Sequence, residues 1–225
     1  MPTPEIVCVL GMHRSGTSLI TALLQSLGAH LGPPEHMMKP QPDNPRGFYE
    51  HQLLNDIDEE ILARLGGSWS EPPVLGVGWE TGTALGDLRQ RARAIIQSDF
   101  GAAPLWSWKN PRTCLTLPFW QRLLPSMRYV ICLRNPIDVA RSLRRRNGFS
   151  LDKGVDLWMT HVTSSLSHTS GRRRLLVFYE DVMGDVDREA ERLATFLDRR
   201  EEPVVLALEV AHDMCPVPLE GIDAG

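Results

Sequence analysis

The residue types and spacing between positions 11 and 18 are those of a phosphate-binding loop. Gly11 and Gly16 enclose four residues, and Ser18 follows two positions later. This is the spacing of the nucleotide P-loop, in which backbone N–H groups and a helix N-terminus face an anion. Thr17 stands where a P-loop has its lysine, and the nearest cation, Arg14, lies inside the turn. The segment predicts a phosphate cradle with a relocated cation, which weighs against an ordinary ATPase or kinase.

The flanking sequence has the order of elements that such a loop requires. Residues 6–10 are apolar and predict a buried strand, and residues 17–27 have the apolar spacing of a helix. Further strands are predicted at 105–109, 129–133 and 175–179, and further helices at 48–65, 85–98, 115–124, from 136, at 151–167 and at 186–197. Strands that alternate with helices imply a parallel sheet with its ligand at the carboxyl ends of the strands. We expect one α/β domain over residues 1–225, a three-layer, P-loop NTPase-like sandwich with helices on both faces of a central parallel sheet.

Two segments, residues 32–50 and 66–82, interrupt this alternation with prolines and glycines. They are too long for ordinary connections, so we predict irregular loops on the acceptor side of the site. Tryptophans lie at positions 69, 79, 106 and 108 and could line a pocket there. We expect at least half of them to belong to the local core instead.

Composition and charge bound the class of protein. With 42% hydrophobic and 23% charged residues, the chain is typical of a soluble globular protein, and its net charge of −4 gives no support to nucleic-acid binding. Six arginines lie between positions 128 and 146, where Asp138 is the only acidic residue. This local excess of positive charge favours a compact polyanion as ligand. No apolar run has transmembrane length, and the four cysteines are far apart and form no CxxC pair. These features predict a cytoplasmic protein with reduced thiols and no integral membrane segment.

A second pair of residues could also bind phosphate. Arg134 closes the strand predicted at 129–133, and Ser142 lies on the following helix, roughly 10 Å further along. Arginine makes planar, bidentate contacts to phosphate and serine adds a compact hydroxyl donor. Taken alone, the pair is better explained by an arginine that binds a carboxylate and a serine that the helix tolerates.

Together, the loop and the Arg-x7-Ser element resemble the sulfotransferase family, whose members bind 3′-phosphoadenosine-5′-phosphosulfate (PAPS). Residues 13–18 are similar to the family's 5′-phosphosulfate loop, with Arg14 at the basic position, as in the protein-tyrosine branch. Leu133, Arg134 and Ser142 are similar to its 3′-phosphate element, and Tyr179 begins a Tyr-Glu-Asp segment that in the family lies near the adenine. The resemblance implies that the donor binds at His13, Arg14, Ser15, Gly16, Thr17, Ser18, Arg134, Ser142 and Tyr179.

The sequence also departs from the family pattern. No Arg-Lys-Gly segment follows near the C-terminus, where cytosolic members complete the 3′-phosphate site. Their Lys-Thr-His catalytic segment is missing too, and residues 108–112 (Trp-Lys-Asn-Pro-Arg) occupy a comparable strand end. The identity of the general base therefore stays open at this point.

Four residues are candidates for catalysis. Glu50 is the first choice as general base, because the resemblance places a glutamate with this role downstream of the first helix; it could equally be a carboxylate stabilised by a helix N-terminus. His51 is a neighbour with suitable chemistry. Lys109 either contacts the bridging oxygen of the donor or pairs structurally with an acid. Arg14 would stabilise the phosphosulfate charge.

The resemblance implies a sulfotransferase that moves the sulfuryl group of PAPS, in line and without a metal, to the hydroxyl or amine of an unidentified small molecule, glycan, lipid or peptide. One alternative is a P-loop kinase of a small metabolite, which should show the missing lysine and an aspartate for Mg²⁺ at a strand end. The other is a non-catalytic protein that binds the nucleotide and transfers nothing.

Overall fold

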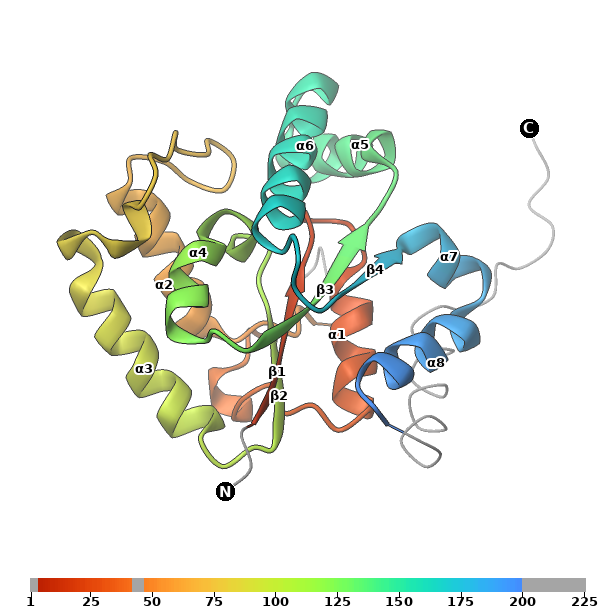
Figure 1. Ribbon diagram of the computed structural model, residues 1–225. Coiled ribbons are helices and arrows are strands. Elements are labelled where there is room, and N and C mark those ends of the chain that lie inside the picture. Colours follow the sequence, from red (N-terminus) through yellow and green to blue (C-terminus); the bar gives the residue numbers. More distant parts are fainter. Residues whose placement is uncertain (1–3, 42–46, 200–225) are drawn as a thin grey trace.

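The computed structural model describes residues 4–41 and 47–199, and its centre is a four-stranded sheet (Figure 1). The strands are β1 (Glu5–Leu10), β2 (Leu105–Lys109), β3 (Met127–Leu133) and β4 (Arg174–Phe178), in the order β2-β1-β3-β4. All three pairings are parallel. The carboxyl ends of the strands therefore meet at one edge, where the predicted binding segments begin.

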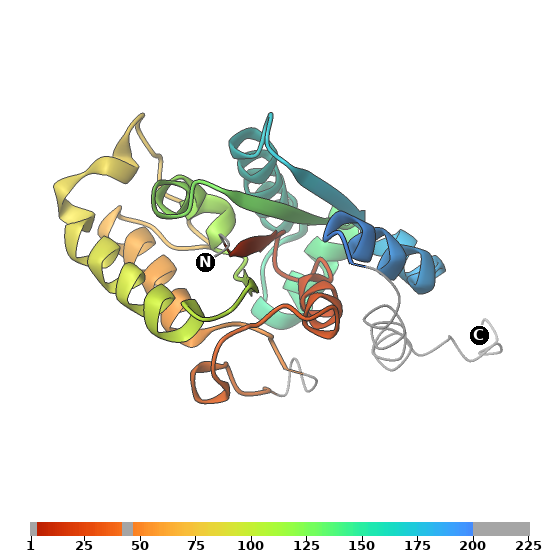
Figure 2. The same cartoon turned by 60° about the horizontal axis from the view of Figure 1, so that its bottom comes forward.

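Helices cover both faces of this sheet because successive strand residues point to opposite sides. Cys8 and Trp108 pack in one core with α2 (Gln52–Arg64), α3 (Gly86–Phe100), α4 (Thr113–Leu123) and α6 (Leu151–His168). Val7 and Val130 pack in a second core with α1 (Thr17–Ser26) and α8 (Val186–Phe196). Figure 2 shows α4 and α1 on opposite sides of β1. The expected three-layer α/β architecture is confirmed.

Several expected element boundaries differ by one or more residues, and two of these differences affect site residues. The helix predicted from residue 48 begins only at Gln52, because the chain before it is extended: the Met38 N–H donates to the Glu50 carbonyl at 2.8 Å, and Met37 bridges to His51. The strand predicted to end at Tyr179 stops one residue earlier, and a short helix, α7 (Tyr179–Gly184), follows. The helix after β3, α5 (Pro136–Asn147), begins as predicted, with the Asn135 side chain accepting the Ile137 N–H.

In their described residues, the helical structure of the two irregular segments is limited to single turns of 3-10 helix at η1 (Pro34–His36) and η2 (Trp79–Thr81), and η3 (Thr83–Leu85) adjoins the second segment. Trp106 and Trp108 are core residues, exposed by 1% and 2%, so the expectation for these two was correct. Cys8, Cys114 and Cys132 are buried free thiols, and Cys215 lies outside the described residues. No helix in the described part of the chain is long and apolar enough to cross a membrane.

Candidate active site

The loop between β1 and α1 has the backbone geometry of an anion cradle. Gly11, Arg14 and Gly16 have φ angles of 148°, 70° and 83°, which favour glycine at the two outer positions. A Cβ atom on Gly16 would lie 2.5 Å from the Tyr179 ring, and one on Gly11 would lie 2.7 Å from the Cys132 carbonyl oxygen. Both glycines are therefore required for the loop to pass close to its neighbours. The helix α1 starts at Thr17, so its N-terminus faces the space that the loop encloses.

Side chains from the second motif hold this loop. The Arg14 Nε donates to the Ser142 Oγ at 3.0 Å, and an Arg134 Nη donates to the Arg14 carbonyl at 3.0 Å. The Arg134 guanidinium also lies over the Tyr179 ring, 4.2 Å from its centroid. The two sequence elements 120 residues apart thus form one continuous arrangement of cations and hydroxyls at the sheet edge.

A buried ion pair lies beside the loop. Lys109, the last residue of β2, pairs with Glu50, and both residues are almost completely buried. The Lys109 ammonium also donates to the Ser18 Oγ at 3.3 Å, and the Asn55 amide donates to the second Glu50 oxygen at 2.6 Å. The carboxylate is therefore held on both oxygens, and one ammonium group connects it to the phosphate-binding loop.

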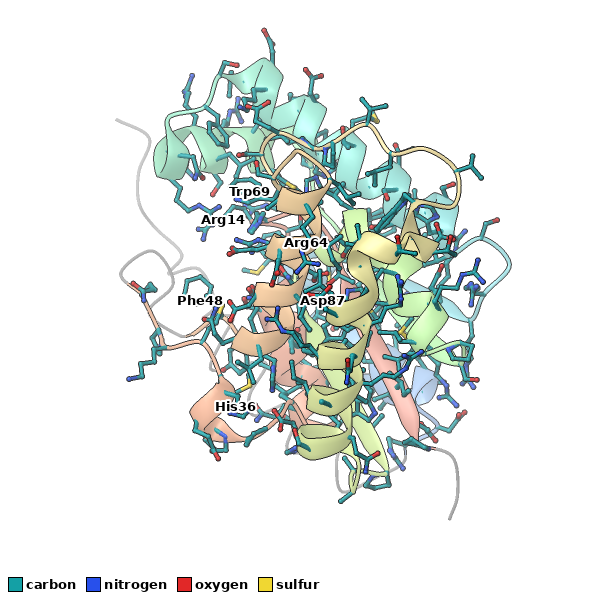
Figure 3. All side chains as sticks on the ribbon, turned by 90° about the vertical axis from the view of Figure 1, so that its left-hand side faces the viewer. Arg14, His36, Phe48, Arg64, Trp69 and Asp87 are labelled. Atoms are coloured by element: carbon teal, nitrogen blue, oxygen red, sulfur yellow. The ribbon has the colours of Figure 1, made fainter. Side chains whose placement is uncertain are left out.

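These groups surround a cavity of about 580 Å³. Nine of the predicted site residues line it: His13, Arg14, Gly16, Thr17, Ser18, Glu50, Lys109, Arg134 and Tyr179. Further cations, Arg112 and Arg146, and the side chains of Phe48 and Trp69 complete the wall. Figure 3 shows Arg14 between Trp69 and Phe48 in this view. Among the described lining residues the only acid is Glu50, so the cavity is strongly cationic and suits a polyanion.

Ser15 and Ser142 are predicted site residues that do not line the cavity themselves. The Ser15 side chain is buried and its backbone N–H is used within the turn, donating to the Met12 carbonyl at 3.2 Å. Ser142 is buried behind Arg14, whose guanidinium it holds. Ser15 shapes the loop, and Ser142 acts on the cavity indirectly, by holding the Arg14 guanidinium in place.

His51 faces away from the cavity. Its Nδ1 accepts the Leu54 N–H at 3.4 Å as the N-cap of α2, and its Nε2 lies 2.9 Å from the Asp99 carboxylate. Burial lowers the pKa of His51, and the hydrogen bond to Asp99 offsets part of that effect. The structure therefore separates this candidate base from the other three candidates.

His36 joins the same group, with its Nδ1 2.6 Å from the same Asp99 oxygen. The three side chains offer potential metal ligands within 4.8 Å of one another, although they lie far apart in the sequence. However, a neutral His51 that accepts at Nδ1 carries its proton on Nε2 and donates it to Asp99. The observed arrangement is a hydrogen-bonded cluster that ties residues 36 and 51 to the end of α3.

His13 is a neutral residue of the loop. Burial first, and then the positive charges of Arg112 and Arg146, lower its pKa well below the usual value. Its ring packs against Trp69 at a centroid distance of 4.3 Å, and its buried Nε2 has no hydrogen-bond partner within the described part of the chain.

Sequence reasoning missed Asn55 and could not select among the arginines. No motif marks Asn55, which acts only because α2 brings it against Glu50. Of the arginines between 128 and 146, only Arg134 and Arg146 line the cavity. Arg128, for example, pairs with Glu5 and Asp198 at the opposite end of β3, so the cluster does not act as one patch.

Comparison with known proteins agrees with this geometry. A profile described as "Sulfotransferase family" matches residues 4–203. The chain belongs to the sulfotransferase family. Solved structures with the same fold include a sulfotransferase domain of the Synechococcus PCC 7002 olefin synthase, at 18% identity and a TM-score of 0.55, covering 91% of this chain and 77% of that one.

Two further relatives of the sulfotransferase fold extend the comparison. Sulfotransferase STF9 from Mycobacterium avium has 16% identity and a TM-score of 0.58, covering 96% of this chain and 69% of that one. A mouse sulfotransferase complexed with PAP has 13% identity and a TM-score of 0.51, covering 93% of this chain and 65% of that one. A search of curated protein sequences gave no match.

Proposed function

We propose that this sulfotransferase moves the sulfuryl group of PAPS to a hydroxyl or amine acceptor by in-line displacement, using its own cations in place of a metal ion. The observation that carries the proposal is the Lys109 ammonium, which binds both Glu50 and the loop residue Ser18 inside one cavity. A cation in this position lies between a carboxylate that can accept a proton and the loop that would hold the leaving phosphate.

The residues present fit this donor. PAPS carries two phosphates and a sulfate, and the cavity offers guanidinium groups, a helix N-terminus and a glycine loop that packs closely against Tyr179. Arg14 and the start of α1 would hold the 5′-phosphosulfate. Arg134 would hold the 3′-phosphate, Ser142 would support this site by fixing the Arg14 guanidinium, and Tyr179 would lie beside the adenine. The mouse relative complexed with PAP supports this choice of nucleotide.

The reaction would need little covalent chemistry from the protein. As in loose phosphoryl transfer, positioning and electrostatic stabilisation supply most of the acceleration. Glu50 would accept the proton of the acceptor hydroxyl as the oxygen–sulfur bond forms. Lys109 would donate to the oxygen that bridges phosphorus and sulfur, where negative charge develops as the old bond breaks. Asn55 would keep the Glu50 carboxylate oriented.

The two alternatives agree less well with the site. A kinase would require an aspartate at a strand end for Mg²⁺, whereas the one described acid of the cavity, Glu50, is paired with Lys109. A protein that only binds the nucleotide would transfer nothing, and the buried pair of Glu50 and Lys109 next to the loop, which is costly to desolvate, favours a catalytic role instead. The buried free thiols further support the expected cytoplasmic location.

The direct test is incubation with PAPS and a panel of hydroxyl and amine compounds, followed by mass spectrometry for the sulfuryl mass gain. We expect a sulfated product that persists in the presence of EDTA. A parallel incubation with ATP and Mg²⁺ serves as the kinase control. Phosphorylated products from ATP, or no sulfated product although PAP binds, would contradict the proposal.

A further inference from the structure

The cavity has two chemically different ends. Arg134 and Tyr179 mark one end, where α5 begins and α7 follows β4. Trp69 and Arg146 mark the other, where α5 ends. The twelve residues of α5 rise about 18 Å between these ends. Figure 1 shows α7 and residues 66–82 on opposite sides of the loop between β1 and α1.

The Trp69 end holds positive charge that no donor motif uses. The Arg146 guanidinium lies 5.7 Å from the centroid of the Trp69 ring, and Arg112 reaches the same region from the turn after β2. Both arginines act on His13, since their charges contribute to its lowered pKa. Arg112 has an ion-pair partner, Glu59, at the exposed rim, but its buried Nε has no partner within the described residues.

Packing and an ion pair fix the position of Trp69 at this end of the cavity. The Trp69 ring packs against His13 and, at 5.9 Å between centroids, against Phe149. An ion pair between Glu71 and Lys153 ties the same segment to α6. A ligand at this end meets an indole face next to two guanidinium groups, which bind carboxylate, phosphate or sulfate in a planar, bidentate manner.

We infer that the acceptor is a hydroxyl compound that carries an anionic group, bound by Arg112 and Arg146 beside the indole of Trp69. The inference rests on the proposed function, because it assigns the Tyr179 end to the donor and the Trp69 end to the acceptor. The acceptor hydroxyl then points back to Glu50 at the centre of the cavity, and its acidic group points to the end of α5.

The experiment uses matched acceptors and matched variants. The probes are 4-hydroxyphenylacetate and 3-hydroxybenzoate, each compared with its neutral amide, at saturating PAPS and as ligands of the PAP-loaded protein in calorimetry. We expect binding and turnover of a carboxylate in preference to its amide. Arg146→Gln should weaken binding of the carboxylate about 10- to 100-fold, the usual value of a charge-assisted contact, and should affect the amide and the KM for PAPS much less.

Arg145→Gln is the matched control, because Arg145 is the exposed neighbour on the same helix and does not line the cavity. Three results would overturn the inference: no carboxylate binds more tightly than its amide, the two variants behave alike, or Arg146→Gln raises the KM for PAPS rather than for the acceptor. Failure of PAP to bind at all would instead contradict the proposed function, so the two failures are distinguishable.

Discussion

Glu50 and His51 are neighbours in the sequence, yet they belong to two different regions of the molecule. Glu50 enters the cavity and pairs with Lys109 beside the phosphate-binding loop. The His51 side chain points away from the cavity and contacts the Asp99 carboxylate, which also contacts His36. In Figure 3, His36 lies farther from Arg14 than Phe48 does, and so marks the region away from the cavity.

The backbone explains this separation. His51 has extended φ and ψ angles of −84° and 115°, and the segment around it pairs with Met37 and Met38 like a short strand. Successive side chains of an extended segment point to opposite sides. His51 is also packed tightly, because a Cβ on Gly32 would lie 2.4 Å from its ring. Suitable chemistry at adjacent positions therefore says little until the direction of each side chain is known.

We expect the largest loss of activity from a change on the cavity side, at Glu50. Glu50→Gln should lower turnover roughly 10²–10⁴-fold, the range for a positioned acid–base group, while the affinity for PAP stays close to wild type. Steady-state kinetics and calorimetry measure the two quantities. The substitution leaves Lys109 without its charge partner, so PAP binding also reports the folded fraction.

Glu60→Gln is the control for Glu50→Gln, because Glu60 is a carboxylate on α2 that pairs with Arg64 and Arg91 outside the cavity. If Glu50→Gln stays active while a variant of Lys109 or His51 does not, the role of base passes to that residue.

A somewhat smaller effect is expected from the cation. Lys109→Gln should reduce turnover about 10²–10³-fold, as expected when one preorganised donor to developing charge is lost. The KM for PAPS should change less than kcat, because the charge on the bridging oxygen grows only in the transition state. An unchanged kcat would show that Lys109 serves only to neutralise Glu50.

At His51, which lies outside the cavity, we expect a loss of stability rather than of activity. His51→Ala removes the N-cap of α2 and the bond to Asp99, and should lower the free energy of unfolding by about 1–3 kcal/mol. His51→Asn should recover part of this loss because asparagine is a good N-cap. Urea titrations measure both variants. Turnover per folded molecule should stay near wild type, and a large drop in both variants would return His51 to the list of candidate bases.

The smallest effect concerns pH. Burial lowers the pKa of His51 in the folded state, so the unfolded chain takes up a proton at this residue first as the pH falls below 6.5. The wild-type free energy of unfolding should therefore decrease between pH 7 and pH 5, and the decrease should be shallower in His51→Asn. His13 and His161, whose pKa values burial also lowers, contribute equally to both proteins. Parallel curves would show that residue 51 does not contribute to the acid destabilisation.

The sequence was sufficient for the architecture and for the loop because both follow from local patterns. Apolar runs such as residues 129–133 and the glycine spacing at 11 and 16 constrain the backbone directly. The pairing of Lys109 with Glu50 depends instead on the extended segment before α2, and the hydrogen bond that orients Glu50 comes from Asn55. No local sequence pattern encodes these two contacts. For the same reason the sequence could not separate Arg146, which lines the cavity, from its exposed neighbour Arg145.

The cavity is proposed to hold a 3′-phosphorylated adenosine nucleotide, and calorimetry with two nucleotides measures this selectivity. An ordinary ADP gives Arg134, which lines the cavity, no 3′-phosphate to bind, whereas a 3′-phosphate would accept charge-assisted hydrogen bonds from its guanidinium. We predict that adenosine 3′,5′-bisphosphate binds without Mg²⁺ at least tenfold more tightly than ADP, since one such contact contributes about 1.5–3 kcal/mol. Equal affinity for the two nucleotides would contradict the account.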